Sequence, residues 1–302
     1  MTAISLGTPY ITRAELGLLQ PLLPVTLLST DQQDSIILGA SRAIDAYVHT
    51  HFAATIHTAE RHEWNKESLR AYPTHWPVIR IARMRIHVAN TMFATILPGQ
   101  IFINNQEHYV QIVSPALIAS FASPIFTLTM AIPVVEMIYA AGRGEFEVGS
   151  TLAAAVNAVV TTLPVADETP FSVGDVICIG TPDVDEEWMV VASKAPGTVP
   201  PPDTVTVVAR GAYGTTAIAH VLGAPVYRLA SAIPDDVKVA TASIVAALVN
   251  DQVLQAEGLG NLKAATIGSY SITLASDGGV GGFRIPPVAE MILEHYRLIV
   301  AG

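Results

Sequence analysis

The apolar residues between positions 30 and 52 recur every three to four residues, the spacing of one face of an α-helix. That face consists of Ile36, Ile37, Ala40, Ala43, Ile44, Tyr47 and Val48. Thr30 is expected to cap the helix N-terminus, with Gln33 completing a capping box. The opposite face carries Gln33, Arg42, Asp45 and His49. The pattern therefore predicts an amphipathic helix that docks on a core.

Other segments show one of two periods. Helical spacing is found at residues 13–23, 234–256 and from about 287 onward. Alternation typical of a half-buried strand is clearest where Met84, Ile86 and Val88 alternate with Arg83, Arg85 and His87. Further strands are expected at 55–64, near 100–103, 108–113 and 125–130, at 134–141 and at 267–274.

The composition changes at about residue 150. Residues 151–160 fit either a helix or a strand, and the segments 171–180, 187–191, 204–208 and 226–228 carry short β signals separated by turns rich in proline and glycine. We therefore expect an inserted all-β domain at 151–230, of barrel or sandwich type. The closing helices need an apolar partner, so 1–150 and 231–302 are expected to form a common core. The predicted class is α+β, with helices and a small antiparallel sheet in that core.

The composition is apolar, although the chain has a net charge of −10. Hydrophobic residues make up 51% and charged residues 14%, with a mean hydropathy of +0.44. A surface this poor in charge is expected to be covered by other subunits or by lipid. The acidic balance disfavours a protein that grips nucleic acid, which needs clustered Lys and Arg. The single Cys178 excludes an internal disulfide, and its apolar strand predicts a buried core thiol.

Residues 109–135 lack charge and are long enough to cross a membrane. Pro115, Pro124 and Pro133 interrupt the stretch, and interior prolines break a helix. Strands and turns at a subunit contact are the preferred interpretation. A membrane-associated protein is the alternative.

Two groups of residues suggest metal chemistry. Asp183, Asp185 and Glu187 lie in an acidic turn, which makes a metal-dependent enzyme centred on residues 183–187 a second alternative. The EF-hand spacing is absent, so a solvated turn is preferred, with Glu187 the residue expected to turn inward. The second group is His49, His51, His57, His62 and Glu63, which lacks a His-Glu-x-x-His pattern. A pH-sensitive surface is favoured there over a metal site.

No catalytic constellation emerges from the sequence. The glycine-rich run 278–282 lacks the Lys-Ser/Thr of a phosphate-binding loop, and a Gly-x-Ser-x-Gly elbow is absent. We therefore expect a protein that is not an enzyme and has no cofactor.

The order of several short motifs resembles the head–tail connector (adaptor) proteins of tailed bacteriophages. A Tyr10-Ile11-Thr12 opening precedes a helix with the run 40–47 (ASRAIDAY) that closes on Phe52. A strand ending at Gly142, a helix entered through Pro234-Asp235-Asp236, a strand near 267–272 and a last helix with Tyr296-Arg297 follow in the family's order. The segments 171–175, 187–191 and 210–217 resemble a small β module that recurs in phage virion proteins.

The resemblance implies a connector-type helical bundle and a structural role in the virion. Such proteins form rings under the portal, which implies about twelve copies of this chain. The implied partners are the portal protein, tail or neck proteins, and viral DNA that passes through the lumen without sequence-specific binding. The implied location is the head–tail junction, after assembly in the bacterial cytoplasm. Interface candidates are Tyr296 and Arg297, together with the basic strand face of Arg80, Arg83 and Arg85, which fits either an acidic surface on a neighbour or a solvated face.

Overall fold

A computed structural model describes residues 9–24, 28–65, 68–88, 91–114, 133–180, 186–197, 202–256, 264–267, 270–273 and 285–297. The chain forms two compact units. The helical unit comprises Met1–Thr50 and Ile233–Gly302, and the β unit comprises His51–Ala232. The expected strand at 125–130 and the glycine-rich run 278–282 lie outside the described residues.

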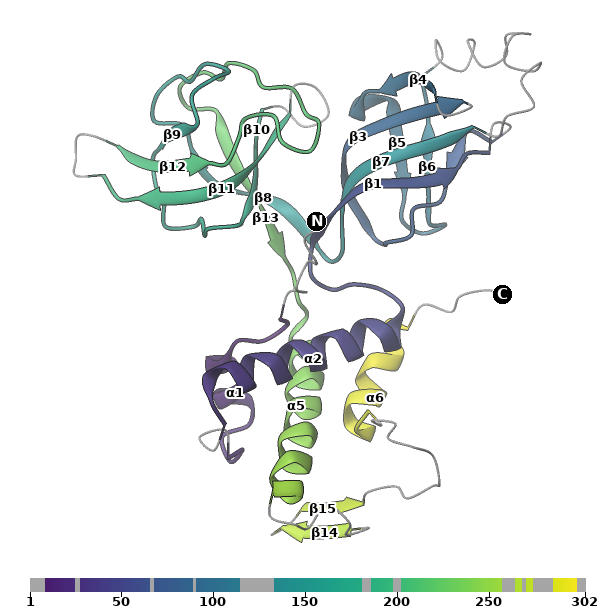
Figure 1. Ribbon diagram of the computed structural model, residues 1–302, viewed down its shortest axis with the longest axis vertical. Coiled ribbons are helices and arrows are strands. Elements are labelled where there is room, and N and C mark those ends of the chain that lie inside the picture. The colour runs from purple at the N-terminus through teal and green to yellow at the C-terminus, as the bar shows by residue number, and fades with distance from the viewer. Residues whose placement is uncertain are drawn as a thin grey trace. The chain divides into compact units, whose positions relative to one another are not determined.

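The helical unit is built by the two ends of the chain (Figure 1). Its helices are α1 (Arg13–Leu19), α2 (Thr30–Val48), α5 (Asp235–Ala256) and α6 (Pro287–Leu293), the last followed by the 3-10 turn η3 (Glu294–Tyr296). Helix α5 contacts α1, α2 and α6, and α2 also contacts α6. The first and last helices therefore share one core, as their apolar faces require.

Helix α2 begins one residue earlier than its sequence pattern indicated. Ser29, rather than Thr30, is the N-cap, and Gln32, rather than Gln33, completes the capping box. Within the run 29–33, both Ser29 with Gln32 and Thr30 with Gln33 have the spacing of a capping box. The observed register lets the Ser29 carbonyl accept the first helical hydrogen bond, from the Gln33 N–H at 3.0 Å. The buried face contains Ile36, Ile37, Ala40, Ser41, Ile44 and Val48, largely as predicted.

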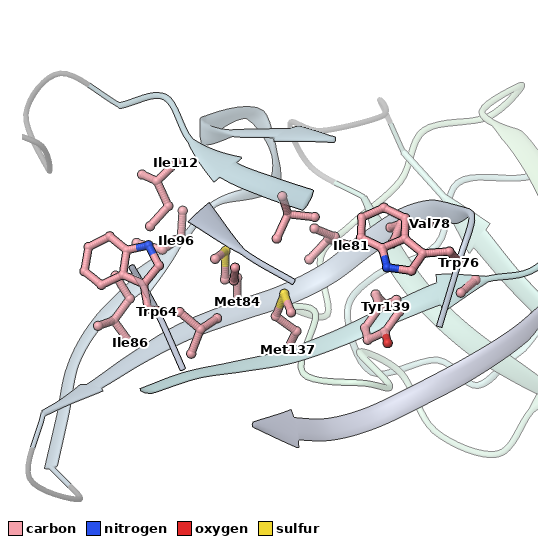
Figure 2. Close-up of a cluster of buried hydrophobic side chains, with 14 residues drawn as sticks. Trp64, Trp76, Val78, Ile81, Met84, Ile86, Ile96, Ile112, Met137 and Tyr139 are labelled. Carbon is pink, nitrogen blue, oxygen red and sulfur yellow. The ribbon is translucent and has the colours of Figure 1, made fainter. Parts of the chain in front are cut away.

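The β unit begins with two antiparallel sheets. One has the order β1-β7-β3-β4, formed by β1 (Thr55–Glu63), β7 (Val134–Ala141), β3 (Val78–Val88) and β4 (Thr91–Ile96). The other has the order β2-β6-β5, formed by β2 (Arg70–Ala71), β6 (Tyr109–Ile112) and β5 (Ile101–Asn104), with the 3-10 turn η2 (Pro98–Gln100) before it. Their buried side chains form a core around Trp64, Trp76, Met84 and Met137 (Figure 2).

The rest of the β unit is a six-stranded antiparallel sheet with the order β8-β13-β10-β11-β12-β9. Its strands are β8 (Gly144–Thr151), β13 (Pro225–Ser231), β10 (Val176–Ile179), β11 (Glu187–Ala195), β12 (Asp203–Val207) and β9 (Thr162–Val165). An isolated bridge between Leu152 and Val165 links the last strand to the end of the first, so the sheet curls around its own core. Cys178 is fully buried, as predicted.

The expected connector-type helical bundle with a small sheet is wrong for this chain. Most of the described structure is β, in sheets of four, three and six strands, and the four described α-helices are short relative to the chain. The reason lies in residues 51–150, which carry enough apolar side chains for a two-sheet core independent of the helices. The expected boundary at 150/151 falls inside β8, which is hydrogen-bonded to β13.

Two smaller expectations also changed. Residues 267–274 were expected to form one strand, but the described part is a hairpin of β14 (Ala264–Ile267) and β15 (Tyr270–Thr273). Residues 152–160 contain isolated bridges rather than a helix or a strand.

Among the described residues, none of the helices combines the length and the apolarity needed to cross a membrane. Most of the stretch 109–135, the basis of the membrane alternative, lies outside them.

Candidate functional site

A cluster of histidines surrounds one carboxylate, Glu60 of β1. On a regular strand, residues three apart point to opposite faces. Strand β1 has an irregularity opposite β7 between His57 and Glu60, where Ala59 takes a φ of 55°. Such a bulge re-aims the side chains that follow it. As a result, His57 and Glu60 approach each other, and His62 joins them at the next position on the Glu60 face.

Each oxygen of Glu60 has two polar neighbours. Oε1 lies 3.1 Å from His75 Nε2 and 3.7 Å from His57 Nδ1. Oε2 lies 3.0 Å from His62 Nε2 and accepts a 2.6 Å hydrogen bond from the Tyr139 hydroxyl. Tyr139 comes from β7, and His75 from the turn before β3, so three separate segments build the site.

The surroundings set the charge state of the cluster. Burial alone would raise the pKa of Glu60, but hydrogen bonds from His62, His75 and Tyr139 outweigh it and hold that pKa well below its usual range. Burial, with His75 close by, lowers the pKa of His57 to about 4. Burial and the neighbouring carboxylate together raise the pKa of Tyr139. Near neutral pH the centre is thus an ionised Glu60 beside a neutral His57.

Three imidazole rings lie against one another beside Glu60. The His57 and His75 rings stack with centroids 3.8 Å apart, and His51 lies 5.0 Å from His75. Of the histidines noted in the sequence, His51, His57 and His62 therefore come together. His49 instead ends α2 in a left-handed conformation, and Glu63 is exposed at the end of β1.

Glu60, His75 and Tyr139 were not predicted from the sequence as members of a site. The spacing His57-x-x-Glu60-x-His62 was the available signal, but strand alternation places His57 and Glu60 on opposite faces unless the bulge is known. His75 and Tyr139 are distant along the chain, and only the pairing of β1 with β7 and the turn before β3 bring them in.

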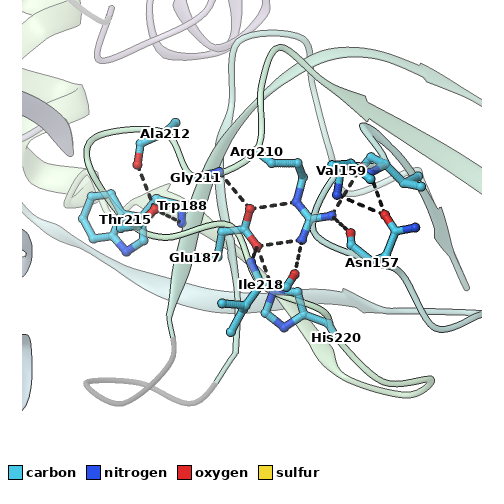
Figure 3. A network of polar contacts seen from close by, with 11 residues as sticks. Asn157, Val159, Glu187, Trp188, Arg210, Gly211, Ala212, Thr215, Ile218 and His220 are labelled. Carbon is cyan, nitrogen blue, oxygen red and sulfur yellow. Dashed lines mark hydrogen bonds and ion pairs between the residues drawn. The ribbon is translucent and has the colours of Figure 1, made fainter.

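Glu187, expected to turn inward, is fully buried at the start of β11. Asp183 and Asp185, its companions in the acidic turn, lie outside the described residues. Arg210 pairs with Glu187 through two 2.7 Å hydrogen bonds, from Nε to Oε1 and from Nη2 to Oε2 (Figure 3). The Gly211 N–H donates to Oε1 at 2.8 Å, and His220 Nε2 lies 3.0 Å from Oε2.

This network explains the charge of Glu187. Burial would raise the pKa of the carboxyl, but hydrogen bonds from His220 and Arg210 reverse the effect and lower it to about 2. Arg210 also donates to the carbonyls of Asn157, Val160 and Ile218, at 2.6, 3.0 and 2.6 Å. The Glu187–Arg210 pair thus joins strand β11 to two connections of the six-stranded sheet, residues 152–161 and 208–224.

The basic face of β3 is partly neutralised by carboxylates of the same chain. Arg80 Nη1 lies 3.1 Å from Glu186 Oε1, and its guanidinium lies 4.9 Å from the ring centroid of Phe146. Arg83 Nη2 lies 3.5 Å from Glu136 Oε1. The Nε of Arg85 is buried and has no hydrogen-bond partner in the described part of the chain.

The remaining interface candidates, Tyr296 and Arg297, lie in the helical unit. The Tyr296 hydroxyl donates to Asp236, at 2.9 Å from Oδ1 and 2.8 Å from Oδ2. Arg297 Nη1 lies 3.6 Å from Glu294 and its guanidinium 5.5 Å from the ring of Tyr47, whose hydroxyl donates to the same glutamate at 2.8 Å. These contacts fix the end of α6 against α2 and α5.

No known family model matches the chain, and no curated protein matches it either.

Proposed function

We propose that this protein is a structural subunit of a tailed-phage virion, a head–tail connector that assembles into a homo-oligomeric ring beneath the portal. The ring, of about twelve copies in the family it resembles, extends the DNA channel toward the tail. The subunit contacts the portal on one side and tail or neck proteins on the other. It works at the head–tail junction by assembly and not by catalysis.

One observation carries the proposal. Apart from the β segments, the residues that carry the resemblance to connector proteins lie at the two ends of the chain. These two ends form one compact unit. Helix α2 contains the 40–47 run, α5 begins directly after Pro234, and the Tyr296-Arg297 pair closes the fold. The proposal rests on this order and not on an overall connector fold, because the chain is mostly β.

The surface of the helical unit also supports assembly. Leu18 and Leu22 are 81% and 87% exposed, and Val288 and Met291 of α6 are 55% and 73% exposed. The region of α1 and helix α6 each present such apolar side chains to solvent, and a contact with a neighbouring subunit would bury them. A subunit of a closed ring must bury two different surfaces, one against each neighbour.

The test is the native mass of the purified full chain, with negative-stain images of the same sample, alone and mixed with the cognate portal protein. We expect closed rings in at least one of the two conditions. The double variant Leu18→Glu with Met291→Glu should lose them, because a ring contact would bury unpaired carboxylates. Val159→Glu, a matched change at an 80% exposed site in the β unit, should keep them.

Two outcomes would count against the proposal. The first is a chain that stays monomeric even with the portal present, and the second is one that requires detergent to remain in solution. A passive channel also predicts that the ring does not retain double-stranded DNA at physiological salt, which a filter-binding assay measures.

A further inference from the structure

We propose that His57, Glu60 and His75 form a binding site for a divalent transition-metal ion of the zinc class. One ligand atom from each residue lies within 4.8 Å of the other two. Two imidazole nitrogens and a carboxylate oxygen are a donor set that zinc accepts, with water in the fourth position. The inference is independent of the proposed ring, since it concerns one subunit.

The distances suit such an ion. Zinc bonds of roughly 2.0–2.2 Å in a tetrahedral site separate neighbouring ligand atoms by about 3.3–3.6 Å. The Glu60 Oε1 atom lies 3.1 Å from His75 Nε2 and 3.7 Å from His57 Nδ1, one slightly below that range and one slightly above it. Two nitrogen ligands favour a zinc-class ion over Mg²⁺ or Ca²⁺, which take oxygen.

The surroundings of His57 prepare one nitrogen for the ion. Its Nε2 lies 3.0 Å from the Thr55 hydroxyl oxygen, so a hydrogen on Nε2 has a partner there. In the tautomer with its hydrogen on Nε2, the Nδ1 lone pair faces the ionised Glu60, at a distance too long for a hydrogen bond. Two electron-rich atoms directed at each other are unfavourable in isolation, and a cation between them removes the repulsion.

The surroundings of Glu60 complete the outer shell of the site. Tyr139 and His62 both hold Oε2, which leaves Oε1 directed toward His57 and His75. Outer-shell hydrogen bonds of this type fix the orientation of metal ligands and tune affinity. Tyr139 and His62 are therefore positioning residues in this proposal, and Thr55 has the same role for His57.

Binding requires two changes at His75: its Nε2 must give up the hydrogen that it donates to Glu60, and its ring must turn. The His57 and His75 rings now stack at an interplanar angle of 13°, whereas two ligands of one ion must direct their lone pairs to a common point. His75 lies in the turn before β3, and its side chain is 28% exposed, so its ring has room to turn. The bound ion would then link strand β1 to that turn and act structurally.

The test uses the full chain, stripped with a chelator and titrated with Zn²⁺ against a competing dye. We expect one saturable equivalent in the unmodified protein. His75→Ala and Glu60→Gln should each weaken binding by more than about 100-fold, and Thr55→Val by about 10–100-fold, the range for an outer-shell change. His295→Ala removes an exposed histidine of the helical unit and should bind as tightly as the unmodified chain.

Two further readouts guard against misfolding and surface binding. Co²⁺ in place of Zn²⁺ should give the visible absorption of a tetrahedral site, lost in His75→Ala, whose far-ultraviolet circular dichroism should stay unchanged. Zn²⁺ should raise the Tm of the unmodified chain, and Mg²⁺ should not. The proposal is overturned by the lack of a saturable equivalent, or by unchanged Zn²⁺ affinity in both His75→Ala and Glu60→Gln. Neither result bears on ring formation.

Discussion

Replacing Arg210 with methionine tests how the six-stranded sheet is held together. The side chain of Arg210 is 4% exposed and that of Glu187 is 0% exposed. Methionine keeps much of the volume but removes both 2.7 Å hydrogen bonds to Glu187 and three to backbone carbonyls. Removing one partner of a buried ion pair costs about 3–5 kcal/mol, because the other charge stays buried and unpaired.

We expect the loss for Arg210→Met to lie in the lower half of that range. Glu187 keeps donors from Gly211, Ile218 and His220, and it can take up a proton when its main partner is gone. The double variant with Glu187→Gln should therefore be at least about 1 kcal/mol more stable than the sum of the two single changes predicts.

The assay must report on the sheet itself, because a chain of two units need not unfold in a single step. Amide hydrogen exchange in β10, β11 and β13 measures the local opening free energy. Arg61→Met is the matched control, since Arg61 is 60% exposed and lies 3.4 Å from Glu136. That exposed pair should contribute about 0–1 kcal/mol. A loss for Arg210→Met no larger than for Arg61→Met would refute the reasoning.

Three further predictions concern stability. The pKa of Glu187 is depressed from 4.5 to about 2, so its contribution of about 3 kcal/mol is present above pH 4.5 and lost as pH falls toward 2. Amide hydrogen exchange in β11, measured as the pH is lowered, should show this loss of stability. Glu187→Gln should make the stability depend less on pH. Gly142→Ala should destabilise the β unit by more than about 2 kcal/mol in denaturant unfolding, because φ is +116° and a Cβ would lie 2.2 Å from the Ala53 carbonyl oxygen. Wild-type stability in that variant would contradict this geometry. Ser29→Ala should cost the helical unit about 1 kcal/mol, and Thr30→Ala much less, by exchange of the α2 amides.

Periodic elements were readable from the sequence. The four described α-helices and strands such as β3 and β7 were expected close to where they occur, because a continuous apolar face repeats within one segment. The burial of Cys178 and the inward turn of Glu187 were also expected from local context, since both lie in apolar strands. The cap of α2 was missed by one residue, because two overlapping capping patterns compete there.

Contacts between distant segments were not readable. The sequence did not show that residues 51–150 form a hydrophobic core of their own. The share of the chain in β structure was therefore underestimated. It singled out Glu187 but could not pair it with Arg210 and His220, which approach it only when the six-stranded sheet curls.

The sequence by itself thus determined the helices and many of the strands. Its apolar, acidic composition also disfavours the binding of nucleic acid. Tertiary structure alone decided that a bulge in β1 turns His57 and Glu60 toward each other, and that β7 and the turn before β3 supply Tyr139 and His75. The physical reason is that local periodicity is set by backbone geometry within a few residues. A site is set by strand register, and that register depends on cores assembled from the whole β unit.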